Sequence, residues 1–307
     1  MPPKIAITTS SFGREDSLPL KLLAKTKFEL VMNPFARTLK EDETIQLVKE
    51  CAGVIAGTEN YDRAVLQQLS QLKVISRCGV GMDNVDVKIA QDKKIKVFNT
   101  PDAPTQAVAE LVIGLALNLF RQVSLMDREI RQGVWRKRMG LQLAGKKLGI
   151  IGFGRIGQAV AKLAKALGVK VFYYDPYVKK SPIAGVKALQ LQELLKEMDI
   201  ISVHLPYTDE TKDFLSEKEF KLMVPNIFLI NCSRGGIVNE IQLYSALKRG
   251  RLAGAAVDVF DQEPYQGPLK ELPNVILTPH IGSYAKEARV KMELEAVENL
   301  IKGLKVR

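Results

Sequence analysis

The fold is decided by the stretch Lys147-Leu148-Gly149-Ile150-Ile151-Gly152-Phe153-Gly154-Arg155-Ile156-Gly157. Its first five residues are typical of a buried strand, and a helical pattern continues through residues 159–167. The pattern Gly-x-Gly-x-x-Gly between them allows a tight turn, close approach of the backbone to a pyrophosphate, and close helix–strand packing. The free N–H groups at the start of a helix favour phosphate. We therefore expect a dinucleotide to be bound by Gly152, Gly154, Arg155, Ile156 and Gly157.

A carboxylate follows the next apolar run. Asp175, after residues 170–174, can accept hydrogen bonds from the ribose hydroxyls of adenosine and repel a 2′-phosphate, which favours NAD over NADP. Lys179 and Lys180 could instead partner a phosphate, and an aspartate before a proline, here Pro176, often opens a turn. The glycine pattern alone is weak evidence. The strand before it, the helix after it and this acid agree, so we expect NAD as the cofactor.

The rest of the chain alternates short β-branched runs with helical patterns, which predicts an α/β fold with parallel sheets. The runs form two sets, separated by a long helical stretch over residues 105–133 and a basic, aromatic segment over residues 135–138. We expect a small N-terminal α/β domain, a six-stranded parallel nucleotide-binding sheet and a C-terminal helix over residues 285–302. Periodicity alone leaves open whether that helix returns to the first domain.

Composition limits the class of protein. A chain of 307 residues favours two domains. Three cysteines without CxxC spacing and only two histidines argue against a disulfide framework or a zinc site, so we expect no metal and a reducing, cytoplasmic location. The N-terminus lacks the apolar core of a secretory signal, and the apolar stretch 107–120 carries Glu110 and Asn118, so no membrane association is expected. The net charge of +11 is scattered, so nucleic acid is not an expected partner.

The predicted strand ends of the second set carry chemically useful side chains. Ligands of open parallel sheets bind outside the carboxyl ends of the strands. These ends are Gly152, Asp175, His204-Leu205-Pro206, Cys232-Ser233-Arg234, Asp258 and Thr278-Pro279-His280. A guanidinium can bind the carboxylate and carbonyl of a 2-oxo acid, and a histidine can donate a proton near neutral pH. The set predicts a hydride-transfer site.

The two histidines are not equivalent in this prediction. His204 is more simply interpreted as a strand-end residue near the cofactor. His280 could be oriented by a carboxylate such as Glu263, which would favour its imidazolium form. Spacing in the sequence does not establish that pairing.

These residues resemble the D-isomer-specific 2-hydroxyacid dehydrogenase family over nearly the whole chain, and most closely its short phosphoglycerate-dehydrogenase-like members. The stretches that carry the resemblance are residues 76–86, 152–157, 203–206, 231–238, 254–264 and 278–282. The resemblance implies two Rossmann-like or flavodoxin-like domains. The smaller, substrate-binding domain comprises residues 1–100 and 284–307. The NAD-binding domain, residues 101–283, is inserted into it and pairs two subunits as a homodimer through an arm over residues 105–140.

The resemblance also implies roles for single residues. Arg234 would bind and polarise the 2-oxo acid, His280 would donate a proton to the carbonyl oxygen, and Glu263 would tune His280. Asp258 would bind the nicotinamide carboxamide. The other implied cofactor contacts are His204, Leu205, Pro206, Cys232, Ser233 and Gly282. Substrate contacts are expected from Arg77 and from a nest of backbone N–H groups over Cys78, Gly79, Val80 and Gly81.

The substrate is less closely defined. Residues 102–105 and Asn239 depart from the usual family pattern, and the former put the identity of the substrate in doubt. In similar phosphoglycerate enzymes a basic arm such as Arg136-Lys137-Arg138 meets the substrate phosphate of the neighbouring subunit, although a solvated loop is equally compatible with this segment. We therefore expect an oxidoreductase for 3-phosphoglycerate/3-phosphohydroxypyruvate, with glyoxylate or hydroxypyruvate reduction as the alternative. An NAD(H)-sensing corepressor is the alternative from another class, disfavoured by the intact trio and the lack of long disordered tails.

Overall fold

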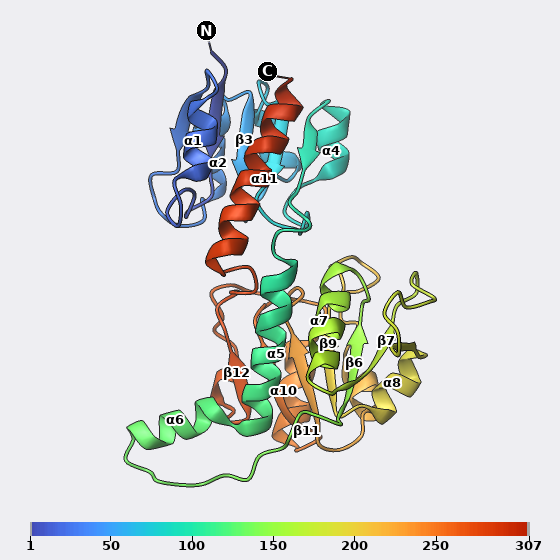
Figure 1. The fold of residues 1–307 in the computed structure, drawn as a ribbon. Helices are drawn as coiled ribbons and strands as arrows, with labels where there is room; N and C mark the ends of the chain where they lie inside the picture. Colours follow the sequence, from blue (N-terminus) through green and yellow to red (C-terminus); the bar gives the residue numbers. More distant parts are fainter. Residues whose placement is uncertain (1, 306–307) are drawn as a thin grey trace. The chain divides into compact units, whose positions relative to one another are not determined.

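The computed structural model describes residues 2–305, which form two compact units. Unit 1 comprises the chain up to Pro104 together with the residues from Ser283 onward, and unit 2 comprises Thr105–Gly282. The predicted junctions, after residues 100 and 283, lie within a few residues of these limits. Each unit is described by itself below, with the element labels of Figure 1.

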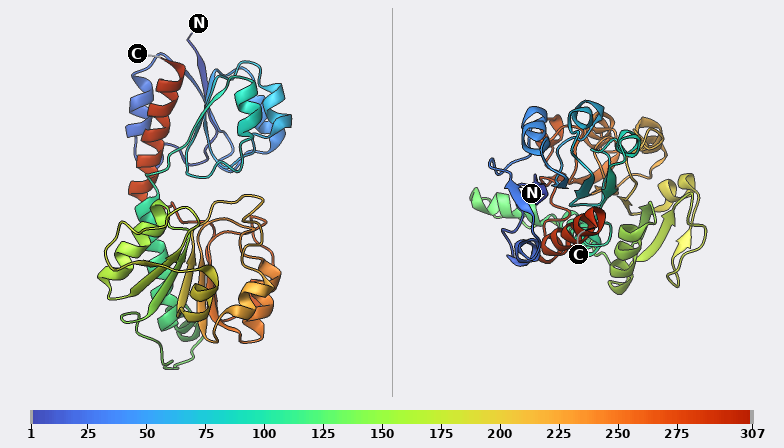
Figure 2. Two further views of the ribbon diagram at one scale, coloured as in Figure 1. Left: turned by 90° about the vertical axis from the view of Figure 1, so that its right-hand side faces the viewer. Right: turned by 90° about the horizontal axis from the view of Figure 1, so that it is seen from above.

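Unit 1 contains a five-stranded parallel sheet in the order β2-β1-β3-β4-β5. Its strands are β1 (Lys4–Ile7), β2 (Glu29–Met32), β3 (Gly53–Ala56), β4 (Val74–Arg77) and β5 (Lys96–Phe98). Its helices are α1 (Leu18–Ala24), α2 (Glu41–Val48), α3 (Arg63–Gln68), α4 (Val87–Asp92) and α11 (Lys286–Leu304). Figure 2 shows α1 and α11 on one face of this sheet and the other helices on the opposite face.

The C-terminal helix α11 answers the question that periodicity left open, because it packs on the sheet of unit 1. The Ser76 hydroxyl donates to the carbonyl of Ala296 at 2.7 Å, and Ala296 and Leu300 are fully buried. Gly303 lies so close to Val74 and Phe98 that a Cβ there would contact both at under 3.0 Å. The unit is therefore completed by residues from both ends of the chain.

Unit 2 contains a seven-stranded parallel sheet in the order β12-β11-β10-β9-β6-β7-β8. Its strands are β6 (Lys147–Ile151), β7 (Lys170–Tyr174), β8 (Lys187–Ala188), β9 (Ile200–Val203), β10 (Ile227–Asn231), β11 (Leu252–Val257) and β12 (Val275–Leu277). Six of these were expected, and β8 was missed because its two residues are exposed and show no apolar pattern. The predicted α/β fold with two parallel sheets is confirmed, with this correction to the strand count.

Two helical layers cover the sheet of unit 2. The helices are α5 (Thr105–Arg121), α6 (Val123–Arg131), α7 (Arg155–Ala166), α8 (Leu191–Glu197), α9 (Glu217–Leu222), α10 (Glu240–Lys248) and the short 3-10 helix η1 (Pro268–Glu271). One buried cluster joins α5 and α7 to the sheet, and a second joins α8, α9 and α10 to its other face. The sheet is thus covered on both sides, as its continuous apolar strands require.

The predicted single helix over residues 105–133 is in fact two helices. Gln122 has a left-handed backbone (φ +54°), and the axes of α5 and α6 differ in direction by 62°. The side-chain amide oxygen of Asn118 accepts from the Ser124 N–H at 2.9 Å and so holds the bend. Within residues 2–305 no single helix meets the length and hydropathy criteria for a membrane span; only the bent pair α5 and α6 does so jointly.

Candidate active site

The carboxyl ends of the unit 2 strands lie level with one another. Parallel pairing sets the last strand residues directly opposite their neighbours. The aligned positions are Ile151 with Tyr174 and Val203, Asn231 with Val203 and Val257, and Val257 with Leu277. The residue after each of these positions is one of the predicted site residues, so the register brings the predicted strand ends to one edge of the sheet.

The glycine turn between β6 and α7 leaves no room for side chains. Gly152 has φ +92°, and a Cβ there would lie 2.6 Å from the carbonyl oxygen of His204. A Cβ at Gly157 would collide with the carbonyl oxygen of Gly152, whereas Gly154, the N-cap of α7, faces open space. A bare backbone at the start of a twelve-residue helix fits the pyrophosphate of NAD.

Asp175 contacts this turn directly. Its carboxylate accepts from the N–H of Phe153 at 2.7 Å, and from the N–H groups of Tyr177 and Val178 at 2.8 and 3.0 Å. Both interpretations of the residue are therefore compatible with the structure, because it opens a turn and also stands beside the glycine turn. A carboxylate has about four acceptor positions, so capacity for a ribose hydroxyl remains.

His204 is held as a neutral residue. Burial lowers its pKa to about 4, and its Nε2 lies 2.8 Å from the hydroxyl of Ser202, a partner that the sequence did not suggest. Its Nδ1 has no hydrogen-bond partner among residues 2–305. A neutral imidazole at neutral pH is a poor proton donor, which agrees with the simpler interpretation as a strand-end residue.

His280 and Glu263 form the pair that spacing could not establish. Nδ1 of His280 lies 2.9 and 3.1 Å from the two carboxylate oxygens of Glu263. Partial burial raises the pKa of Glu263, but the hydrogen bond and charge of His280, the N–H of Phe260 and the charge of Arg234 together hold it below 4.5. Both side chains remain partly exposed. The imidazole is thus oriented by an ionised carboxylate and keeps its Nε2 available for chemistry.

Arg234 belongs to the same group, because its charge lowers the pKa of Glu263. Its guanidinium donates to the carbonyl of Ser233 at 2.7 Å. The two glycines after it are required by packing. A Cβ at Gly235 would collide with the backbone of Phe260, and Gly236 has φ +75° and lies against the ring of Tyr207. The turn of residues 234–236, called the arginine turn below, therefore packs directly on the segment that leads to Glu263.

Three further predicted residues near the edge are buried. Asp258 accepts from the Thr278 hydroxyl at 2.6 Å and from the N–H groups of Ile281 and Gly282 at 2.8 Å each. Ser233 donates its hydroxyl to Asn231 at 2.6 Å. Cys232 is a reduced thiol. Burial, and to a lesser extent the charge of Asp258, raises the pKa of this thiol well above its ordinary value. Burial makes this cysteine unreactive.

In unit 1 the predicted nest is narrower than expected. The N–H of Cys78 donates to the carbonyl of Ala56 at 2.8 Å, and that of Gly79 to the hydroxyl of Thr100 at 2.8 Å. Within residues 2–305 the N–H groups of Val80 and Gly81 donate no hydrogen bond. The guanidinium of Arg77 lies over Gly79 and donates to the carbonyl of Cys78 at 2.8 Å. Substrate binding by this turn stays a prediction and applies best to Val80 and Gly81.

The predicted basic arm also divides into different roles. Arg138 forms a two-point ion pair with Glu129 of α6, at 2.6 and 3.0 Å. Arg136 and Lys137 are exposed and form no hydrogen bond or ion pair within residues 2–305, although the charge of Arg136 helps to lower the pKa of Glu129. Only these two basic side chains of the arm are therefore available for a ligand.

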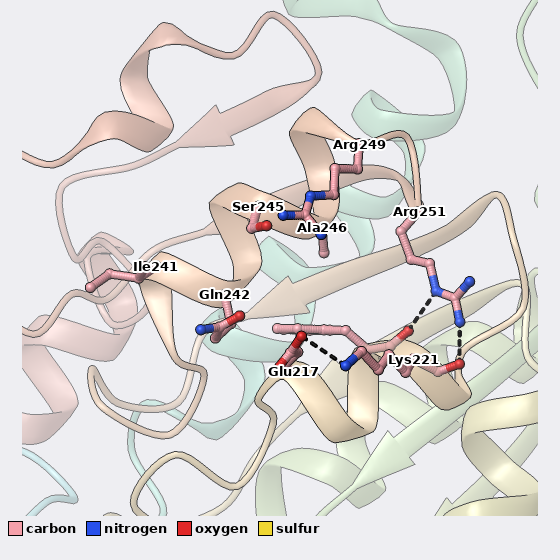
Figure 3. Close-up of a pocket in the computed structure, with 9 residues that line it drawn as sticks. Glu217, Lys221, Ile241, Gln242, Ser245, Ala246, Arg249 and Arg251 are labelled. Atoms are coloured by element: carbon pink, nitrogen blue, oxygen red, sulfur yellow. Dashed lines mark hydrogen bonds and ion pairs between the residues drawn. The ribbon is translucent and has the colours of Figure 1, made fainter.

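A surface hollow lies elsewhere on unit 2, between α9 and α10 (Figure 3). Arg251 donates to the carbonyls of Phe220 and Lys221, and Lys221 pairs with Glu217 at 2.8 Å. Arg251 directly precedes β11, at the amino end of the strands. The charged side chains of Arg251 and Lys221 in this hollow are thus engaged in holding the end of α9. The hollow lies away from the carboxyl ends of the strands, where the predicted site residues are. Among residues 2–305 no cluster of His, Cys, Asp or Glu could hold a metal ion.

Comparison with known proteins identifies the family. Residues 113–282 match the model of the D-isomer specific 2-hydroxyacid dehydrogenase NAD binding domain. Glyoxylate reductase of Thermococcus litoralis is 44% identical over 80% of this chain and 77% of its own length. D-3-phosphoglycerate dehydrogenase of Methanocaldococcus jannaschii is 41% identical over 88% of this chain, which spans only about half (53%) of that relative.

A solved structure agrees with the sequence relatives. The TT0316 protein from Thermus thermophilus superposes with a TM-score of 0.90 at 37% identity, covering 99% of this chain and 97% of that one. The expected family resemblance and the NAD-binding domain are thereby confirmed. The chain belongs to the D-isomer-specific 2-hydroxyacid dehydrogenase family, whose members are NAD-dependent oxidoreductases that act on the CH–OH groups of 2-hydroxy acids.

Proposed function

We propose that this protein is an NAD-dependent D-2-hydroxyacid dehydrogenase that interconverts a small 2-oxo acid and its 2-hydroxy acid. The observation that carries the proposal is the His280–Glu263 pair, at 2.9 Å, on the sheet edge that also carries the glycine turn and Arg234. That edge combines a proton donor, a guanidinium and a nucleotide cradle, which are the parts that hydride transfer to a carbonyl requires.

Each side chain has a defined part in the reaction. NAD, when bound, supplies or accepts the hydride. The Arg234 guanidinium binds the carboxylate of the 2-oxo acid and polarises its carbonyl. His280 donates the proton from Nε2 to the carbonyl oxygen, and takes it back in the oxidative direction. Glu263 accepts from Nδ1–H, which keeps the ring oriented and stabilises the imidazolium.

Turnover tests the proposal. We expect NADH to be oxidised in the presence of at least one member of a panel of 2-oxo acids, followed by nicotinamide absorbance. His280→Ala should nearly abolish turnover while NADH still binds, measured by fluorescence titration. A fully active His280→Ala variant would contradict the assigned role, and no oxidation with any 2-oxo acid would contradict the proposed activity.

For the substrate we propose 3-phosphoglycerate/3-phosphohydroxypyruvate, with glyoxylate or hydroxypyruvate reduction as the second candidate. The exposed cations of Arg136 and Lys137 and the M. jannaschii relative support the first. The ion pair that withdraws Arg138 from the arm, and the T. litoralis relative, favour the second.

The two substrate classes can be separated by one comparison. If the arm binds a phosphate, Arg136→Ala with Lys137→Ala raises KM for 3-phosphohydroxypyruvate and leaves KM for hydroxypyruvate unchanged. Lys196→Ala with Lys218→Ala, two exposed cations of α8 and α9, is the matched control. An unaltered KM for the phosphorylated acid would eliminate the arm hypothesis.

We further propose a homodimer that uses α6 and the segment after it. No residue of α6 is buried within the chain, and Figure 1 shows this helix and the following loop projecting from unit 2. Large apolar side chains along them are exposed: Val123, Ile130, Val134, Trp135, Met139 and Leu141. An exposed apolar stretch of this kind is typical of a contact surface.

We also propose a cytoplasmic location, which the three unpaired cysteines support, because disulfides are rare in reducing compartments.

A further inference from the structure

We propose that Asp258 and Thr278 are positioning residues that hold His280 in its working conformation. The inference rests on the proposed role of His280 as proton donor. The residues concerned, Asp258 with Thr278, Ile281 and Gly282, are called the Asp258 network here. All of them belong to unit 2.

Asp258 forms hydrogen bonds with residues that precede and follow His280 in the chain. One carboxylate oxygen of Asp258 accepts from the Thr278 hydroxyl at 2.6 Å and from the Ile281 N–H at 2.8 Å. The other oxygen accepts from the Gly282 N–H at 2.8 Å. Asp258 is 1% exposed and is itself anchored at the end of β11, where its N–H donates to Asn231. Asp258, which is held at the end of the sheet, thus fixes the positions of the residues before and after His280.

The backbone of His280 explains why such ties are needed. Its φ is +54°, in the left-handed region that residues other than glycine rarely adopt, and its N–H donates to the carbonyl of Thr278 at 3.0 Å. A residue in this region keeps its conformation only where the surroundings impose it. Without the network, we expect His280 to relax toward an ordinary backbone conformation, which would turn the imidazole away from Glu263.

The chemistry of the position calls for a carboxylate. Its two oxygens accept from three donors, which an asparagine could not do, because its amide nitrogen would face one of the N–H groups. Burial raises the pKa of Asp258, while its three hydrogen bonds and the charge of His280 oppose that rise.

Thr278 allows the proposal to be tested without altering the carboxylate. Thr278→Val removes only the hydroxyl, and Thr278→Ser retains it. We expect Thr278→Val to lower kcat roughly tenfold to a hundredfold, because small misplacements of a reacting group cost rates of that order. The dissociation constant of NADH should stay within twofold, and Thr278→Ser should restore most of kcat. Thr44→Val, which removes another buried hydroxyl, from α2 of unit 1, is the control and should leave kcat unchanged.

A spectroscopic measurement makes the test independent of turnover. The chain has only two histidines, so the imidazole nitrogen signals in an NMR spectrum can be assigned to His204 and His280. We expect Thr278→Val to shift or broaden the His280 signals and to leave those of His204 in place. Thr278→Ala serves the same purpose if Thr278→Val does not fold.

The outcomes separate the two hypotheses. Wild-type kcat together with unchanged His280 signals in the hydroxyl-free variant would overturn the positioning role and leave the proposed function intact. A loss of kcat matched by an equal weakening of NADH binding, or one that Thr278→Ser fails to rescue, would also overturn it. An inactive wild-type protein would contradict the proposed function, while the NMR comparison would still test the network.

Discussion

Glu263 and Asp258 both lie near His280, yet their surroundings move their pKa values in opposite directions. Burial dominates at Asp258 and raises its pKa. At Glu263 the hydrogen bond and charge of His280, the N–H of Phe260 and the charge of Arg234 together outweigh burial and lower the pKa. Carboxylates whose environments separate their pKa values usually have different roles. In the proposed mechanism Glu263 pairs with the proton-donating ring of His280, and Asp258 supports the backbone on either side of that residue.

The lowered pKa of Glu263 has a consequence for stability at low pH. A carboxylate whose pKa is lower in the folded protein stabilises the fold above its unfolded pKa, and this contribution is lost as pH falls through the folded value. We expect the free energy of unfolding of wild-type protein to exceed that of Glu263→Gln just above pH 4.5, where the carboxylate is ionised. The difference should shrink below pH 4.5. Urea unfolding at several pH values measures it, and a difference that grows on acidification would contradict the pairing.

Tyr173 provides a second test at the scale of single residues. It is fully buried, its ring stacks on Phe153 at 3.9 Å beneath the glycine turn, and its hydroxyl has no partner within residues 2–305. An unpaired buried hydroxyl is destabilising, so Tyr173→Phe should raise the free energy of unfolding by about 1 kcal/mol. Tyr61→Phe is the matched control, because that equally buried hydroxyl donates to Glu59 at 3.0 Å and its loss should be destabilising. Thermal or urea unfolding distinguishes them, and a destabilised Tyr173→Phe would show that its hydroxyl is satisfied.

At the scale of elements, the ends of helices and strands decide how the site is held. Asn239, at which the sequence departs from the pattern of the family it resembles, caps α10 by accepting from the N–H of Gln242 at 3.0 Å. Its amide also donates to Asp213 at 2.9 Å, and the N–H of Asp213 donates to Gly236 in the arginine turn. The unusual residue is therefore explained by its neighbour, because two carboxylates could not form this contact.

That contact predicts the effect of an aspartate at position 239. Asn239→Asp keeps the helix cap but brings two negative charges together, and we expect it to lower the free energy of unfolding by about 1 kcal/mol. Adding Asp213→Asn should recover most of the loss, which a double-mutant cycle quantifies. Additive effects of the two substitutions would mean that the residues do not interact in solution.

The element scale also shows where prediction from the sequence fails. The helical apolar pattern continues past residue 122, so the spacing of apolar residues does not predict the bend between α5 and α6. The bend depends on a left-handed Gln122 and a hydrogen bond between Asn118 and Ser124. Strand β8 escapes prediction for a related reason, since a two-residue edge strand with exposed side chains has no pattern to recognise.

At the scale of the whole molecule, the arm formed by α6 and residues 132–141 is the feature that one chain alone leaves unexplained. Trp135 is 83% exposed and is the only tryptophan, and Met139 is 96% exposed. Side chains of this size are seldom left in water unless another surface covers them. The proposed second subunit would supply that surface.

The single tryptophan reports on such an association. We expect sedimentation to give a dimer, and dilution to shift the fluorescence of Trp135 toward that of an exposed tryptophan. Val123→Asp with Ile130→Asp should shift the mass toward the monomer, because charges replace apolar side chains that are each 55% exposed on α6. Ile241→Asp, at an exposed apolar residue of α10, is the control and should remain dimeric. A wild-type monomer with fully exposed Trp135 emission at every concentration would reject the proposal.

The sequence by itself determined the α/β class, the glycine turn and the set of strand ends that carry Asp175, Arg234 and His280. These features depend on local patterns: a strand has an apolar run, a phosphate turn needs glycine, and parallel strands end at a common edge. The hydrogen bond of His280 to Glu263 and the return of α11 to unit 1 were implied by the family resemblance but left open by spacing and periodicity, and the tertiary structure decided them. The Asp258 network and the ion pair of Arg138 with Glu129 were decided by the tertiary structure alone. Each of these depends on the backbone conformation and side-chain direction of residues brought together by folding, which no period in the sequence encodes.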